Sequence, residues 1–79
     1  MFSKTYPNLN WWIENQGWIE IGTNDQVDTM IRILDEGGDC FEVEFEDAES
    51  FDDALDQADR WCATEIEDRI GEEPPHRYD

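Results

Sequence analysis

Carboxylates are the side chains in this sequence whose number and spacing could do chemistry. From Ile33 to Asp59 there are twelve Asp or Glu residues and no Lys or Arg. A surface with this charge would speed the association of a cationic partner and make binding sensitive to salt, because exposed charges are screened by ions. The same residues could instead form a solvated surface that only maintains solubility. The sequence leaves both interpretations open.

Two groups within this block define a candidate acidic surface. One group alternates along an expected strand, and the other lies on the outer face of an expected helix. The six residues are Glu42, Glu44, Glu46, Asp52, Asp56 and Asp59. Rows of carboxylates on a rigid scaffold could imitate nucleic-acid phosphates and occupy the binding site of a basic DNA-binding protein. This mimicry is the alternative function.

Metal and catalytic motifs do not emerge from the spacing. The segment Asn24–Asp28 vaguely resembles a calcium loop, but it lacks the central glycine and has Asp35 where the loop needs a glutamate. The single histidine, His76, follows two prolines, whereas a general base needs a held position. Cys40 and Cys62 have no metal-type spacing, so we expect reduced thiols, with a disulfide left open. We therefore expect no catalytic residues, metal or cofactor.

Tryptophan supplies a second candidate surface. Trp11 and Trp12 are adjacent and would face opposite sides of a strand, so at least one would point away from the helix. Aromatic side chains are favoured anchors of protein interfaces. The predicted interaction surface on the outer sheet face is formed by Trp11, Trp12, Trp18, Met30 and Leu34, with the rim acids Glu20, Glu42 and Glu44. Alternatively, these rings form a small core beneath the N-terminal arm.

One long helix must hold part of these side chains in place. From Ser50 to Ile70, apolar residues recur at spacings of three and four, the pattern of one helix face. Ser50 and Asp53 form a weak capping box at its start. Gly71 ends the helix, since glycine readily adopts the left-handed conformation found after helices.

The rest of the sequence is predicted to form β-strands, an N-terminal arm and a C-terminal tail. A Gly-containing turn favours a hairpin over residues 11–22, and β-branched residues favour a strand from Thr29 to Leu34. Strict alternation predicts another strand from Cys40 to Glu46. We expect residues 1–10 to be an irregular arm and residues 71–79 to be a disordered tail.

These elements predict the α+β class as one domain over 1–79 with a globular core over 11–70. The expected architecture is a four-stranded antiparallel β-meander with one long C-terminal helix on one face, in the order ββββα. The preferred register pairs Ile33 with Val43, Ile31 with Phe45 and Arg32 with Glu44. The expected core consists of Ile19, Ile21, Ile31, Ile33, Phe41, Val43, Phe45, Phe51, Leu55, Ala58, Trp61, Cys62 and Ile66.

The overall charge narrows the range of partners. Twenty-two acidic residues against five basic ones give a formal net charge of −17 over 79 residues. Nucleic acids and anionic membranes need Lys and Arg facing their phosphates, so neither is expected as a direct partner. The sequence shows neither a signal peptide nor the roughly 20 apolar residues of a membrane span, so a cytoplasmic location is the default.

Three segments carry a recognisable local pattern, and they run from Trp18 to Gly22, from Ile31 to Gly38 and from Ser50 to Leu55. Together they resemble a class of small uncharacterised bacterial proteins. In these, a strand ending in a Leu-Asp-Glu-Gly-Gly-type turn is followed by a strand and a helix. The resemblance covers about residues 11–70 and implies an α+β fold without an activity. We therefore expect a non-catalytic protein that acts through contact with another protein, or with a second copy through the outer sheet face.

Overall fold

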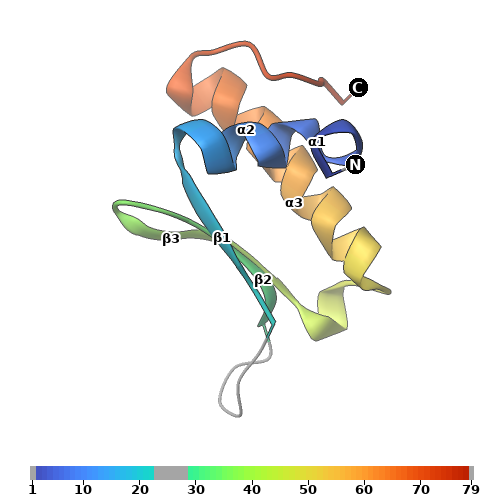
Figure 1. Cartoon of the computed structure of the whole chain (residues 1–79). Helices are drawn as coiled ribbons and strands as arrows, with labels where there is room; N and C mark the ends of the chain where they lie inside the picture. Colours follow the sequence, from blue (N-terminus) through green and yellow to red (C-terminus); the bar gives the residue numbers. More distant parts are fainter. Residues whose placement is uncertain (1, 23–28, 79) are drawn as a thin grey trace.

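The computed structural model describes residues 2–22 and 29–78, and it places helices on one side of a three-stranded antiparallel sheet (Figure 1). The α+β class with a C-terminal helix is confirmed, whereas the predicted fourth strand is not found among the described residues. The elements in chain order are α1 (Phe2–Thr5), α2 (Pro7–Asn15), β1 (Gly17–Ile21), β2 (Thr29–Asp35), β3 (Gly38–Glu44), the 3₁₀ turn η1 (Phe45–Asp47), α3 (Phe51–Glu65) and the π-helical turn η2 (Ile66–Ile70).

The N-terminal region differs most from the prediction. The described part of the expected irregular arm forms α1 and the start of α2, and the expected strand at residues 11–13 is helical. Pro7 stands at the first position of α2, where its missing N–H costs nothing and its fixed φ suits a helix. Leu9 and Trp12, three residues apart, then lie on one helix face and are fully buried. Burial of this face outweighs the β preference of Trp and Ile.

The sheet keeps an apolar inner face, but in a different register. Strand order is β1-β2-β3. The predicted pairs Ile33–Val43, Ile31–Phe45 and Arg32–Glu44 are wrong by two residues, because the connecting loop is only Glu36–Gly37. The observed partners across β2 and β3 are Ile31–Val43, Arg32–Glu42 and Ile33–Phe41, and Asp35 pairs with Gly38.

Two irregularities in the β2–β3 ladder enclose this apolar pairing. The partners skip Met30 on one strand and Cys40 on the other. An extra residue of this kind changes which side chains share a face. Met30 and Cys40 both pack against the core, while Thr29 donates its hydroxyl to Glu42 at 3.1 Å on the outer face. Met30 is therefore not on the outer face, where the regular alternation had placed it.

The buried core is formed by side chains from α2, α3 and the sheet. Much of the predicted core is confirmed, and Ile19, Phe41 and Trp61 pack partly buried against it. Ile21, Phe45 and Phe51 are instead exposed. The buried apolar residues of the core cluster are Tyr6, Leu9, Trp12, Ile31, Ile33, Val43, Ala54, Leu55, Ala58, Cys62 and Ile66.

Helix α3 begins and ends with the predicted local chemistry. Ser50 accepts the backbone N–H of Asp53 through its Oγ at 3.1 Å, and Gly71 adopts φ +83° at the end of η2. None of the helices in the described ranges is both long and apolar enough to cross a lipid bilayer.

The tail after Gly71 is irregular but lies on the helices (Figure 1). Pro74 is buried, and the backbone N–H of His76 donates to Asn8 Oδ1 at 3.0 Å. Tyr78 donates its hydroxyl to Asp59. The tail was predicted to be disordered, but its described residues, up to Tyr78, form specific contacts. The polar composition of the tail does not predict these contacts.

Gly17 is required by a close approach between β1 and β2. A Cβ atom at this position would lie 2.0 Å from the carbonyl oxygen of Leu34 and 2.9 Å from the Asp35 Cα. We expect Gly17→Ala to lower the free energy of unfolding by about 2 kcal/mol, since backbone atoms must move apart. Urea denaturation followed by circular dichroism would measure it. Gly37→Ala is the control, because its Cβ would meet only the Asp35 side chain at 3.2 Å; equal losses for both variants would contradict the prediction.

Candidate functional site

The predicted tryptophan surface is divided between the core and the outside. Trp12 is fully buried, and its Nε1–H donates to the Leu34 carbonyl at 3.0 Å. Trp61 packs edge-on against it with ring centroids 5.3 Å apart. Trp11 is half-buried on α2, which leaves Trp18, 44% exposed, as the exposed tryptophan among the four. Trp12 therefore belongs to the small-core interpretation of these rings.

The outer sheet face is mainly a polar surface organised by Arg32. Its guanidinium contacts Glu20 at 3.2 Å and both carboxylate oxygens of Asp39 at 2.8 Å. Arg32 takes these partners in place of the predicted Glu44, because the register differs. Leu34 is buried, so the apolar part of the predicted surface is reduced to Trp18. Glu42 and Glu44 are exposed on β3.

The Arg32 cluster sets the titration of Asp39. The hydrogen bond from Arg32, aided by its charge, lowers the pKa of the Asp39 carboxyl below its ordinary value. We expect Arg32→Gln to raise this pKa, and carbon-detected NMR titration of Asp39 would measure it. A depressed pKa stabilises the fold above the unfolded value and loses that stabilisation as the pH falls through the folded value. An unchanged Asp39 pKa in Arg32→Gln would contradict the assignment.

The predicted acidic surface is also divided. Asp52 is exposed, whereas Asp56 forms an ion pair with Arg60 at 2.9 Å. Asp59 is fully buried between α3 and α2, and was wrongly placed on the outside of the helix. Asp52, Asp56 and Asp59 therefore do not form a row of three exposed carboxylates along α3. Glu42, Glu44 and Glu46 remain exposed.

Asp59 instead joins three segments of the chain. Its carboxylate accepts the backbone N–H of Leu9 at 2.8 Å, the Asn8 amide at 3.0 Å and the hydroxyl of Tyr78. Burial, then the bond to Asp59, raises the pKa of Tyr78. Since every partner is a structural group of the fold, we assign this buried cluster to stability.

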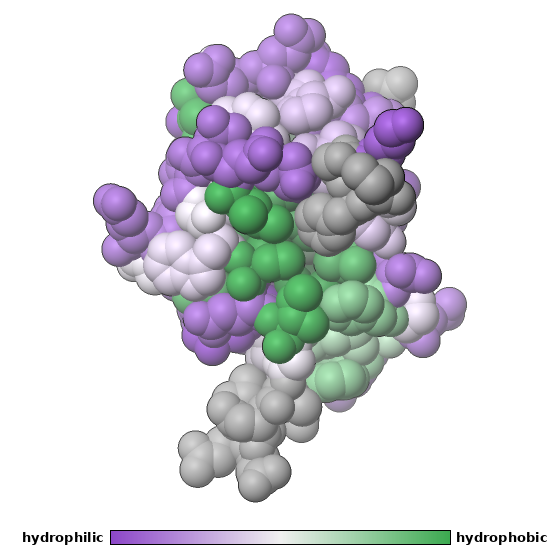
Figure 2. All heavy atoms as spheres, in the orientation of Figure 1, coloured by the Kyte–Doolittle hydropathy of each residue, from purple (hydrophilic) through white to green (hydrophobic). Residues whose placement is uncertain are grey.

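An open apolar band lies at the end of the sheet where β3 leads into α3. We define the band as Ile21, Phe45 and Phe51, which are 57%, 46% and 43% exposed. Figure 2 shows apolar side chains gathered over β1 and towards the start of α3, with hydrophilic ones around them. Periodicity placed all three residues in the core. The signal against that assignment is the acidic link between the two phenylalanines, which has the composition of a solvated edge.

Carboxylates without an ion pair flank Phe45 and Phe51 along the chain. They are exposed, and none forms an ion pair within residues 2–22 and 29–78, where the four arginines pair elsewhere. Partial desolvation, followed by the charges of Glu46 and Asp47, raises the pKa of Glu44. We call this set the acidic rim: Glu44, Glu46, Asp47, Glu49 and Asp52.

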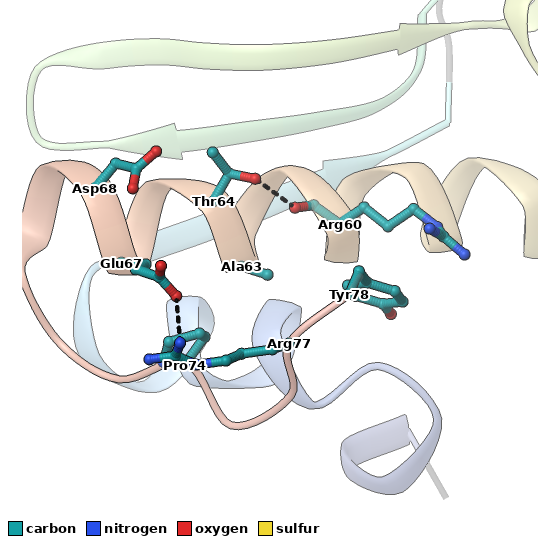
Figure 3. Close-up of a pocket in the computed structure, with 8 residues that line it drawn as sticks. All are labelled: Arg60, Ala63, Thr64, Glu67, Asp68, Pro74, Arg77 and Tyr78. Atoms are coloured by element: carbon teal, nitrogen blue, oxygen red, sulfur yellow. Dashed lines mark hydrogen bonds and ion pairs between the residues drawn. The ribbon is translucent and has the colours of Figure 1, made fainter.

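A small cavity of about 140 Å³ lies between α3, η2 and the tail (Figure 3). Its two arginines are engaged, Arg60 with Asp56 and Arg77 with Glu67 at 3.3 Å, and Arg60 also stacks on the Tyr78 ring. No free cationic group is left there to hold an anion. The lining residues are Arg60, Ala63, Thr64, Glu67, Asp68, Pro74, Arg77 and Tyr78.

The remaining candidates for chemistry offer little. Cys62 is buried, and burial raises the pKa of its thiol, so a reactive thiolate is disfavoured. Cys40 is half-buried and its pKa is also raised by burial. The segment Asn24–Asp28, considered above as a calcium loop, lies outside the described residues.

No family model matches the chain, and comparisons with curated proteins and with solved structures find no match either. The resemblance to small bacterial proteins therefore stays a prediction. A function for this chain has to be inferred from its own surface chemistry.

Proposed function

We propose that this chain is a non-catalytic binding module whose partner is a basic protein. The observation that carries the proposal is the acidic rim next to exposed apolar side chains at one end of the sheet. Apolar area supplies affinity, and complementary charge supplies encounter rate and selectivity. The net charge of −17 supports a cationic partner over a second copy, because two copies would repel each other.

This proposal differs from the surface expected on the outer sheet face. That face offers less apolar surface than expected, because Trp12 is in the core, Met30 packs half-buried against the core and Leu34 is buried, and Arg32 neutralises part of its charge. Nucleic-acid mimicry through the helix acids Asp52, Asp56 and Asp59 and the strand glutamates is supported less well, because Asp59 is buried and only the strand glutamates stay exposed as a row.

Affinity capture from the source cell at low and high salt tests the proposal, followed by binding measurements on the purified captured protein. We expect a basic protein whose affinity falls as salt rises. A triple variant, Glu46→Gln, Asp47→Asn and Glu49→Gln, should weaken that binding. The matched control, Glu14→Gln, Glu36→Gln and Glu72→Gln, changes the net charge equally at exposed sites away from the acidic rim. Equal weakening by both triples, or binding that ignores salt, would overturn the proposal.

A further inference from the structure

We propose that the open apolar band binds an amphipathic helix of the partner, with Lys or Arg on both sides of its apolar stripe. The inference rests on the proposed function and adds the docking site and the form of the partner. Amphipathic helices laid in apolar grooves, anchored by residues three and four apart, are a recurring mode of recognition.

The three band residues belong to elements that end or begin at the same end of the sheet. Ile21 ends β1 and pairs with Ile31, while Phe45 directly follows Glu44, which pairs with Thr29 at the start of β2. Phe51 opens α3 after the short acidic link. Single exposed apolar residues are ordinary on protein surfaces, but large ones gathered at one place mark an interaction site.

An incomplete helical layer explains why this end is open. Helix α2 has nine residues and covers the sheet near Gly17, where Trp12 bonds to the Leu34 carbonyl. Beyond Ile19, β1 continues to Ile21 without a helix of this chain described above it, while α3 runs over β2 and β3. One further helix beside the start of α3 would complete the layer, since packed helices lie about 8–10 Å apart.

Charge complementarity defines the chemistry of that helix. The acidic rim carries five carboxylates that no cation of the described residues pairs with. A basic helix would bring Lys or Arg beside them as its apolar residues cover Ile21, Phe45 and Phe51. A second copy of this chain would bring another acidic rim to the same place.

Synthetic peptides of leucine and lysine, about 14 residues long, provide the probe. One peptide carries leucine at spacings of three and four, and the other has the same composition in an order without an apolar face. Binding is measured by fluorescence anisotropy with the full chain, and peptide helicity by circular dichroism. The variants are Phe45→Ser and Ile21→Thr. The matched control is Trp18→Ser, because Trp18 and Phe45 are similarly exposed. Unfolding midpoints verify that each variant is folded.

We expect the amphipathic peptide to gain helicity on binding, and to bind about tenfold more weakly to Phe45→Ser or Ile21→Thr than to the unmodified chain and Trp18→Ser. Equal binding of both peptides, or equal affinity of the Phe45→Ser and Trp18→Ser variants, would overturn the docking site but leave charge-led binding of a basic protein intact. A peptide bound as an added strand on β1, or a dimer that buries the band, would overturn the proposal that the partner binds as a helix. Failure of both peptides to bind at low salt would overturn the proposed function as well.

Discussion

Replacement of Asp59 by alanine is expected to lower the free energy of unfolding by about 3 kcal/mol. The Asp59 carboxylate is fully buried and accepts hydrogen bonds from Asn8, Leu9 and Tyr78. Removing it leaves the Leu9 N–H and the Asn8 amide buried without their acceptor, which costs more than the net value of the bonds themselves.

The position of Leu9 makes this loss larger than that of an ordinary hydrogen bond. Leu9 lies in the first turn of α2, where backbone N–H groups have no partner within the helix, and Tyr6 at the N-cap provides no side-chain cap. Asp59 therefore caps α2 from another helix, with its negative charge at the positive end of the α2 dipole. Without it, the helix loses both a hydrogen bond and its attachment to α3.

Urea denaturation followed by circular dichroism would measure the Asp59→Ala effect. Asp56→Ala is the matched control, because Asp56 is one turn away and its ion pair with Arg60 is at the surface. Such a pair contributes about 0.5 kcal/mol or less. Tyr78→Phe should fall between the two at about 1 kcal/mol, since it removes one of three bonds. Similar losses in Asp59→Ala and Asp56→Ala would show that the buried carboxylate does not join the helices.

Helix α3 could be predicted from sequence because its information is local. The spacing of apolar residues, the Ser50 cap and Gly71 all lie within or next to the element, and each is confirmed. Strand β2 and the alternating part of β3 were predictable for the same reason. The register of β2 and β3 could not be predicted from the sequence. It depends on two residues that the pairing skips, and their effect appears only when both strands are placed.

Helix α2 and Asp59 could not be predicted separately. The spacing of Pro7, Leu9 and Trp12 was compatible with a helix, but its cap lies about fifty residues further along the chain. With no second helix expected, only one face of α3 needed to be buried, so Asp59 was placed outside. In the structure α3 is covered by the sheet on one side, and by α2 and the tail on another.

The open apolar band is the reverse case, because its residues were predicted to be buried and are exposed. Helical and strand periodicity placed Phe51 and Phe45 in the core, but both are exposed, and Phe45 lies in the 3₁₀ turn η1 instead of in β3. Periodicity describes the direction of a side chain, and burial additionally requires something on the other side. Residues that periodicity assigns to the core but that the structure exposes are therefore the basis of the interface proposed above.

Trp12→Ala is expected to have the largest effect of any single change, a loss of about 4 kcal/mol from the free energy of unfolding. Trp12 is the largest fully buried side chain, and its removal leaves a cavity beside Trp61 and Leu9. It also leaves the Leu34 carbonyl without the Nε1–H donor. A chain of 79 residues has roughly 4–12 kcal/mol of stability in total, so this variant should be close to unfolding.

Two further variants separate the origins of this loss in urea denaturation. Trp12→Phe keeps most of the buried ring and removes the donor to Leu34, so we expect about 2 kcal/mol. Trp18→Ala removes the same side chain from a position that is 44% exposed and pairs with Leu34 on the outer face, so we expect less than about 1 kcal/mol. A larger loss of stability for the Trp12 variants than for Trp18→Ala would show that the Trp12 ring is part of the core and not of the predicted interaction surface. If Trp12→Ala and Trp18→Ala were equally stable, Trp12 would have to lie at the surface, and α2 would not be packed against the sheet through this ring.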